Sequence, residues 1–196
     1  MSSDPASDAS PPGTHISLDA KGLRALAHPV RVEMLTLLRK HGPSTATRIG
    51  ERLGINSGAA SYHLRQLAAA GFVAEDTGRG NARERWWRSL HDRTVLRDPE
   101  LARQEPEAVL AYLQSVVTSH NLHVQQTLAQ AMAMPPAWQE VIDMSNWRLR
   151  LTPEQTLSMR SELADVITRY QHAESDDERA EPVTLLTYVL PGPEES

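Results

Sequence analysis

The chain contains no cysteine, a single phenylalanine, and fewer basic than acidic residues. The absence of cysteine excludes disulfides, thiolate metal sites and a cysteine nucleophile, and it fits a protein of the reducing cytoplasm. With four Trp, four Tyr and one Phe in 196 residues, the core must consist mainly of Leu, Val, Ile and Ala, which favours a helical fold. The first 14 residues carry no basic residue and no apolar stretch, so we expect a disordered tail there and neither a signal peptide nor a membrane anchor.

The deficit of basic charge is unevenly distributed. Residues 18–97 contain 14 Lys and Arg against 7 Asp and Glu, a net charge of +7, whereas the remaining residues carry 6 against 18, a net charge of -12. A basic segment within an acidic chain is expected where one module attracts phosphate and the others face solvent or a partner subunit. A solvated basic face without a ligand would give the same count.

Apolar residues at three- and four-residue spacing predict four helices in the basic segment. The expected ranges are 18–27, 29–41, 44–53 and 56–70. Pro29 suits the first position of the second helix, and glycines follow the last three. Because the third and fourth helices are short and a turn with Gly54 and Ile55 separates them, they are predicted to form a helix-turn-helix.

A β-hairpin is predicted directly after the fourth helix. Residues 72–77 form the first strand, residues 78–81 (Gly-Arg-Gly-Asn) supply the turn, and residues 83–90 form the second strand. Since neighbouring strand residues face opposite ways, at least one of Trp86 and Trp87 should be buried, and the other is expected to cover the long helix described next.

The second half of the chain is predicted to contain one long helix and a small appendage. The helix runs from Pro99 to Met134 and ends before Pro135-Pro136. It has an apolar stripe that residues 18–97 are too few to cover, which favours a dimer interface. The appendage is a strand over 147–151, a helix that begins with a capping box at Thr152, and a strand over 183–190. It either binds an apolar ligand or only supports the dimer.

These elements define the predicted fold class: mainly α with small β. The expected domains are a disordered tail (1–17), a winged helix-turn-helix DNA-binding domain (18–97), and a region with the dimerisation helix and the strand-helix-strand appendage (98–196).

The fourth helix has the division of residues that a recognition helix needs. The major groove of DNA admits one α-helix, which requires polar or small residues on the exposed face and apolar residues behind them. The predicted base-contacting residues are Ser57, Ser61, Tyr62 and Arg65, opposite Leu64 and Leu67. The hairpin, or wing, contributes Arg79 and Arg83 at its tip, with Arg85 and Arg88 further along the second strand, for phosphates or the minor groove. His63 is expected to donate to a backbone carbonyl and not to read DNA.

The chain resembles ArsR-type winged helix-turn-helix regulators over about residues 18–95. The resemblance rests on three motifs, Ala-His-Pro-Val-Arg at 27–31, Ser-Tyr-His-Leu-Arg at 61–65 and Gly-Phe-Val at 71–73. It implies a homodimer that represses transcription by binding imperfect palindromes, with the dimer held by helices that flank the winged domain.

Members of that family that sense metals do so through cysteines of the third helix or through Asp and His of the last helix. This chain has no cysteine, and Glu107 and Val109 stand where the upstream ligands of the last helix are expected. His120 and His123 are one turn apart, but two nitrogens do not complete a tetrahedral zinc site. No metal site and no cofactor are therefore predicted, although a role for these two histidines in some metal site stays open.

The predicted function is sequence-specific binding of double-stranded DNA by a cytoplasmic homodimer that regulates transcription, and the family resemblance implies that it acts as a repressor. No catalytic constellation of nucleophile, carboxylate pair or glycine-rich loop is present, so no enzymatic activity is expected. No membrane contact is expected, and a small-molecule effector is a further candidate partner. The alternative is a winged-helix protein-interaction module or ligand-responsive adaptor that no longer binds DNA.

Overall fold

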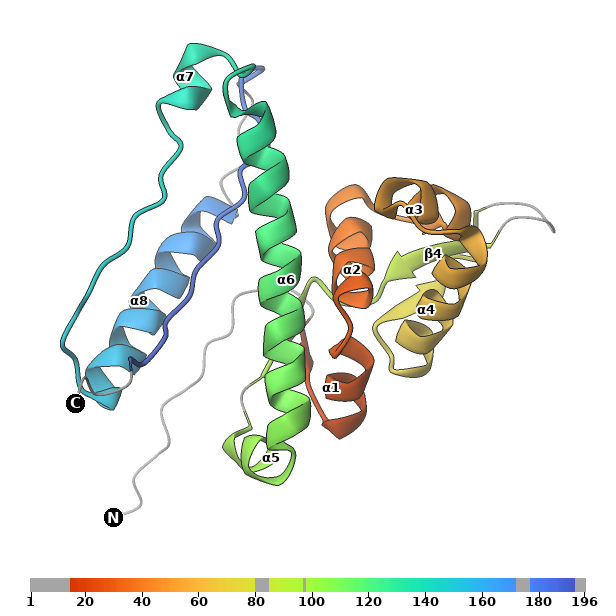
Figure 1. The fold of residues 1–196 in the computed structure, drawn as a ribbon, viewed down its shortest axis with the longest axis horizontal. Coiled ribbons are helices and arrows are strands. Elements are labelled where there is room, and N and C mark those ends of the chain that lie inside the picture. The colour runs from red at the N-terminus through yellow and green to blue at the C-terminus, as the bar shows by residue number, and fades with distance from the viewer. Residues whose placement is uncertain (1–14, 80–84, 97, 172–176, 193–196) are drawn as a thin grey trace. The chain divides into compact units, whose positions relative to one another are not determined.

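The computed structural model describes residues 15–79, 85–96, 98–171 and 177–192. The chain divides into two compact units, one spanning Pro12–Ala133 and one that includes Met134–Ser196. Helices α1 to α6 belong to the first unit and α7 and α8 to the second (Figure 1). The long helix is thus part of the same unit as residues 18–97, which the sequence assigns to a domain of their own.

The first two helices begin at side-chain caps. Helix α1 (Ala20–Leu26) is capped by Asp19, whose Oδ1 accepts a hydrogen bond from the backbone N–H of Gly22 at 2.6 Å. Helix α2 (Pro29–His41) has the predicted bounds, because the ring of His28 accepts a hydrogen bond from the N–H of Val30 at 3.2 Å and Pro29 fits the first helical turn.

The predicted helix-turn-helix is present as α3 (Ala46–Leu53) and α4 (Ser57–Ala69). Gly54 ends α3 in the left-handed conformation with φ 66°, which glycine adopts without steric cost. The side chain of Asn56 then accepts a hydrogen bond from the N–H of Ala59 at 2.8 Å and starts α4. The turn is tight, since a Cβ at Gly50 would lie 2.8 Å from the carbonyl oxygen of Ile55.

The hairpin forms within a three-stranded antiparallel sheet. Strands β3 (Val73–Glu75) and β4 (Trp86–Ser89) pair as predicted, with Val73 opposite Ser89. A strand that the sequence does not reveal, β2 (Ser44–Thr45), pairs with the other edge of β4. The tip of the hairpin, including Arg83, lies outside the described residues.

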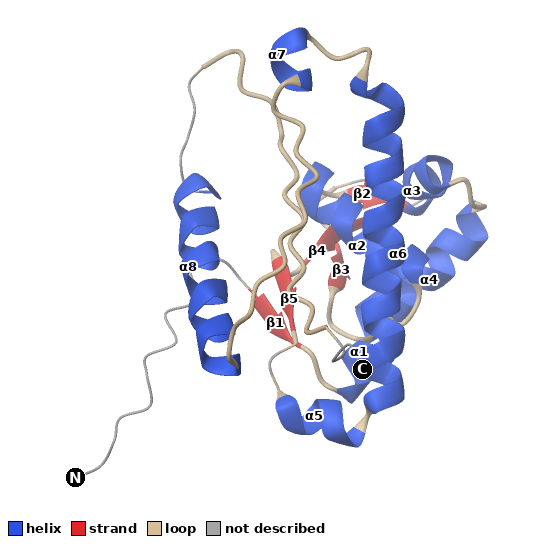
Figure 2. Cartoon of the chain, turned by 60° about the vertical axis from the view of Figure 1, so that its left-hand side comes forward, coloured by secondary structure: helices blue, strands red, loops and turns tan. Residues whose placement is uncertain are grey.

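A second pair of strands connects the two ends of the winged region. Strand β1 (His15–Ser17) runs parallel to β5 (Arg93–Val95), with Ile16 opposite Thr94 (Figure 2). The sequence places residues 15–17 in the tail. A three-residue strand carries too short a pattern to be recognised without its partner.

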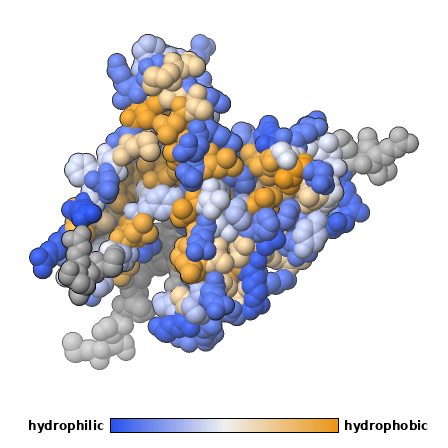
Figure 3. Space-filling view, viewed as in Figure 1, coloured by the Kyte–Doolittle hydropathy of each residue, from blue (hydrophilic) through white to orange (hydrophobic). Residues whose placement is uncertain are grey.

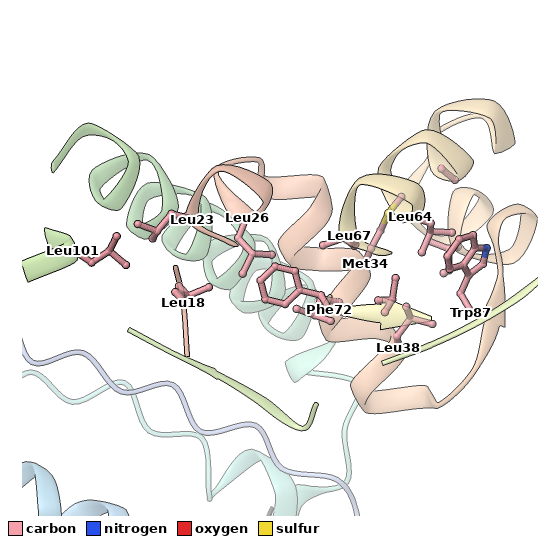
Figure 4. Packing of buried hydrophobic residues seen from close by; sticks show 14 residues of the cluster. Leu18, Leu23, Leu26, Met34, Leu38, Leu64, Leu67, Phe72, Trp87 and Leu101 are labelled. Atoms are coloured by element: carbon pink, nitrogen blue, oxygen red, sulfur yellow. The ribbon is translucent and has the colours of Figure 1, made fainter. Parts of the chain in front are cut away.

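The hydrophobic core joins α1, α2 and α4 to the hairpin (Figure 4). Phe72, Leu64 and Leu67 are completely buried, and Trp87 is 5% exposed. Burial of Trp87 confirms the expectation for the tryptophan pair. Its partner, Trp86, is half-buried and lies beneath Arg48 of α3 instead of covering the long helix.

The single helix predicted over Pro99–Met134 is in fact two helices, α5 (Pro99–Gln104) and α6 (Pro106–Ala131). Glu105 leaves the helical conformation with φ -127° and ψ 52°. The reason is Pro106, which lacks an N–H for the helical hydrogen bond and whose ring clashes with the carbonyl four residues earlier.

Helix α6 packs against α1 and α2. Ser119 on the buried side of α6 donates from Oγ to Oε2 of Glu33 on α2 at 2.5 Å. Arg24 of α1 forms an ion pair with Glu105 at 2.6 Å. No helix in the described ranges is long and apolar enough to cross a membrane.

The second unit contains α7 (Pro136–Gln139) and α8 (Pro153–Gln171). The capping box is confirmed: the N–H of Gln155 donates to Oγ1 of Thr152 at 3.2 Å, and the N–H of Thr152 donates to Oε1 of Gln155 at 2.9 Å. It satisfies donors that have no partner within the helix.

The two strands predicted on either side of α8 are not strands in the described structure. Residues 147–151 and 183–190 are irregular and form no strand. Alternation of apolar and polar residues selects two faces, but a strand also needs a neighbour for its backbone groups. Without one, Trp147 is 79% exposed and Leu190 80% exposed.

Candidate nucleic-acid interface

Helix α4 has one buried and one exposed side. Ala60, Leu64 and Leu67 are completely buried. The four residues predicted to contact bases lie away from this core: Ser57, Tyr62 and Arg65 are exposed and Ser61 is half-buried. The structure therefore brings these four polar side chains together on the outer side of one helix.

Arg65 is the cation on this outer side. It is exposed, and it forms no ion pair with any residue in the described part of the chain. Tyr62 is 52% exposed, which is a large aromatic surface for a residue of a folded domain. A free guanidinium can make two parallel hydrogen bonds to guanine, and a phenol can donate to or accept from a base edge or phosphate.

The arginines of the wing have acidic neighbours. Nε of Arg79 is 3.3 Å from Asp76, and Nη1 of Arg85 is 3.0 Å from Glu75. Both arginine side chains remain more than 60% exposed. Exposed ion pairs contribute only about 0–1 kcal/mol, so a phosphate can replace either carboxylate at little cost. Arg83 lies outside the described residues.

Two further arginines belong to the same region: Arg88, which the sequence places on the second strand of the wing, and Arg48, which the sequence does not single out. The guanidinium of Arg48, near the start of α3, lies 4.9 Å from the ring centroid of Trp86 on β4. Arg88 on β4 is exposed and has no ion-pair partner among the described residues. The sequence gives no separate signal for Arg48, because only the fold places the first turn of α3 beside β4.

His63 occupies the inner side of α4 and faces the start of α2. Its ring centroid is 4.6 Å from that of His28 and 5.4 Å from that of Tyr62. Its Nδ1 is buried and has no hydrogen-bond partner among the described residues, so this nitrogen does not donate to a carbonyl as expected. Burial, followed by the charges of His28 and Arg31, lowers the pKa of His63. Burial and Arg31 also lower the pKa of His28.

Within the described residues, no group of three or more His, Asp or Glu side chains is placed to hold a metal ion. His120 and His123 lie on α6, and burial lowers the pKa of His120.

Comparison with protein families gives one match to the basic segment. Residues 26–76 match a family model described as a helix-turn-helix domain. This range begins at the last residue of α1, contains α2, α3 and α4, and ends after β3. A comparison with curated proteins gives no match.

Three solved structures are similar to parts of the chain. A "possible transcriptional regulator for arsenical resistance" is 24% identical, with 55% of this chain and 97% of that chain covered and a TM-score of 0.32. A double mutant of ZitR from Lactococcus lactis is 19% identical over 68% of this chain and 73% of that chain, with a TM-score of 0.31. AbfR in a disulfide-bonded form is 17% identical over 53% and 68%, with a TM-score of 0.28.

The family match and the geometry agree. Three helices precede α4, a tight turn at Gly54 separates α3 from α4, and an antiparallel hairpin follows α4. This arrangement is the winged form of the helix-turn-helix. The motifs at 27–31, 61–65 and 71–73 lie at the start of α2, within α4 and at the start of β3. Residues 26–76 are therefore a helix-turn-helix domain, and the hairpin that follows α4 gives it the winged form.

Proposed function

We propose that this protein is a cytoplasmic homodimeric repressor that binds an imperfect palindrome in double-stranded DNA. The observation that carries the proposal is the outer side of α4, where Ser57, Ser61, Tyr62 and Arg65 stand over a completely buried row of Ala60, Leu64 and Leu67. A helix with this division enters the major groove with its polar residues and is supported from behind by the core.

The wing supplies contacts of a second kind in this proposal. Arg79 and Arg85 remain exposed beside their carboxylate partners, and Arg83 lies between them in the sequence. Arg79, Arg83 and Arg85, which all lie between β3 and β4, neutralise phosphates or enter the minor groove in this proposal, so they add affinity for any sequence. Arg48 and Arg88 extend this positive surface to α3 and β4.

The dimer is assigned to one face of α6. Leu110, Leu113 and Val117 follow each other at spacings of three and four residues and are 57%, 47% and 52% exposed. Figure 3 shows apolar surface along the length of this helix. The stripe that the sequence indicates is divided by the fold: Val109 and Val116 turn toward the winged region, and Leu113 and Val117 stay outside.

A second copy of the chain is the occupant that fits this exposed seam, defined as Leu110, Leu113 and Val117. Apolar residues at alternating spacings of three and four are the pattern with which two helices pack along each other. Two-fold symmetry places two copies of α4 about 34–36 Å apart, one turn of DNA, which matches a palindrome.

The test compares two arginine variants on operator DNA. The operator is first selected from random duplexes with the full chain, and binding is then measured by fluorescence anisotropy against the operator and against variants with one base pair changed. Arg65→Ala is expected to remove about 1–3 kcal/mol of discrimination at one base pair. Arg79→Ala is expected to weaken all sequences alike and to reduce the salt dependence of binding.

Equal losses on all sequences for both variants would refute the assignment of Arg65 to a base. Absence of specific duplex binding at any ionic strength would favour the protein-interaction module instead, because phosphate contacts always make affinity fall with salt.

A further inference from the structure

A pocket of about 300 Å³ lies in the first unit between α2, α6 and the segment that contains β5. This volume is at the lower end of the range for small-molecule sites. One part of its wall is apolar and consists of Leu26, Val32, Leu35 and Val116. The pocket is not part of the DNA-binding surface, since none of the proposed base or phosphate contacts lines it.

The polar part of the wall contains two guanidinium groups and one carboxylate, from Arg39, Arg93 and Asp92. His120 also lines the pocket, and because burial lowers its pKa it adds little positive charge at neutral pH. The wall therefore has an excess of positive charge. It is suited to an anion with an apolar body.

Arg93 is the group with unused hydrogen-bonding capacity. Its Nη2 is buried and has no hydrogen-bond partner among the described residues. A buried N–H group without an acceptor costs free energy, which a ligand oxygen would recover when the guanidinium turns toward the pocket that Arg93 lines. A carboxylate meets this need best, because its two oxygens match the fork of a guanidinium.

Arg39 and Tyr112 are held in place beside it. Nε of Arg39 donates to the carbonyl oxygen of His91 at 2.9 Å, and Nη2 donates to Oγ1 of Thr94 at 2.9 Å. Burial lowers the pKa of Arg39 to about 10, so this guanidinium is still charged at neutral pH. Burial raises the pKa of Tyr112, which keeps its phenol protonated and able to donate a hydrogen bond.

We propose that this pocket is a binding site for a small amphipathic carboxylate. The carboxylate accepts hydrogen bonds from Arg93, and the apolar body of the ligand lies against Leu35 and Val116. The charge of Arg39 adds attraction without direct contact being required.

The regulatory role of this site rests on the proposed function. The site places an effector between α2, which supports the DNA-binding helix α4, and α6, which carries the proposed dimer seam. Helix α2 contributes Met34, Leu35 and Leu38 to the core that supports α4. Helix α6 carries the exposed seam, and the bond from Ser119 to Glu33 joins the two helices. A ligand between α2 and α6 changes their spacing and thereby the distance between the two copies of α4 in the dimer.

The test uses the full chain and nuclear magnetic resonance titrations with benzoate and hexanoate, each compared with its neutral amide. Three proteins are titrated: the wild type, Arg93→Met, and Arg103→Met as a control. Arg103 is exposed on α5 and pairs only with Glu100 of the same helix in the described structure. We expect at least one carboxylate to shift resonances of α2, α6 and β5, and its amide to bind at least tenfold more weakly.

Arg93→Met should weaken carboxylate binding at least tenfold and abolish the preference over the amide, whereas Arg103→Met should change neither. The inference is overturned if neither carboxylate binds, if the shifts lie elsewhere, or if Arg93→Met binds like the wild type. Operator binding is measured in parallel without ligand. If the protein binds its operator but neither carboxylate, the effector site alone is rejected. If a carboxylate binds but the operator does not, the proposed function alone is rejected.

Discussion

Replacement of Gly50 by alanine tests whether the turn between α3 and α4 is as tight as its geometry indicates. In an ordinary helix interior this change stabilises by about 1 kcal/mol, because alanine loses less backbone freedom on folding. Here the new Cβ would lie 2.8 Å from the carbonyl oxygen of Ile55, a backbone atom that cannot rotate away. The N–H of Ile55 also donates to the carbonyl oxygen of Gly50 at 2.9 Å, so any displacement strains that bond.

The expected magnitude follows from these terms. Overpacking of a close contact costs about 1–3 kcal/mol, and a weakened hydrogen bond adds about 1 kcal/mol. After the gain in helix propensity is subtracted, Gly50→Ala should lower the free energy of unfolding by about 1–3 kcal/mol. Because the displaced turn also changes the position of α4 relative to α3, affinity for the operator should fall too.

The assay is urea unfolding followed by circular dichroism at one fixed protein concentration, since the stability of a dimer depends on concentration. Gly58→Ala is the matched control. A Cβ there would meet only the side-chain oxygen of Asn56, at 3.2 Å, so its stability should stay within about 0.5 kcal/mol of the wild type or exceed it. If Gly50→Ala proves as stable as Gly58→Ala, the turn is not closed by steric contact and the reasoning fails.

Two further predictions concern pH and assembly. The pKa values of His63 and His28 are lowered in the folded state, so the unfolded chain binds protons more readily: stability should be complete above the ordinary histidine pKa of about 6.5 and should fall as pH decreases below it. Urea unfolding at pH 7.5 and 5.5 should show a smaller loss for His63→Gln than for the wild type, and an equal loss would remove His63 from the cause. For assembly, Leu113→Glu should give monomers by light scattering at micromolar concentration, whereas Leu122→Glu should not. The two leucines are 47% and 46% exposed on α6 but lie nine residues, about two and a half turns, apart and thus on opposite sides, so a monomer from both variants or from neither would contradict the seam.

The helices of the winged region could be predicted because their signals are local. Asn56, Gly54 and Pro29 each fix a helix end through the geometry of their own residue, and the spacing of Leu64 and Leu67 identifies the buried side of α4. The capping box at Thr152 could be predicted for the same reason, because its two hydrogen bonds join residues three positions apart.

Features that depend on distant segments could not be predicted. Strand β2 has two residues and exists because β4 offers it an edge, and β1 exists because β5 lies beside it. The reverse holds at 147–151 and 183–190, where the sequence predicts strands but the described structure has none. Pro106 is a different case: a proline disfavours a helix interior and could have marked the break by itself, but the predicted helix extends across it from Pro99 to Met134.

For the candidate site, the exposed residues of α4 could be predicted from the sequence, but the ion pairs and ring contacts of the neighbouring arginines could not. The ion pairs of Arg79 with Asp76 and of Arg85 with Glu75 require the register of the hairpin. The contact of Arg48 with Trp86 requires the placement of α3 against β4. The difference between a paired and an unpaired arginine therefore emerges only in three dimensions.

The parallel pairing of β1 with β5 gives the domain a mechanical property. Because the strands run in the same direction, the start of β1 and the end of β5 lie at opposite ends of the pair. A force applied between the N-terminal tail and α6 would thus slide one strand along the other and load their hydrogen bonds together, whereas an antiparallel pair in the same place would open one bond at a time. The chain enters and leaves the winged region through a clasp that resists being pulled apart along that line.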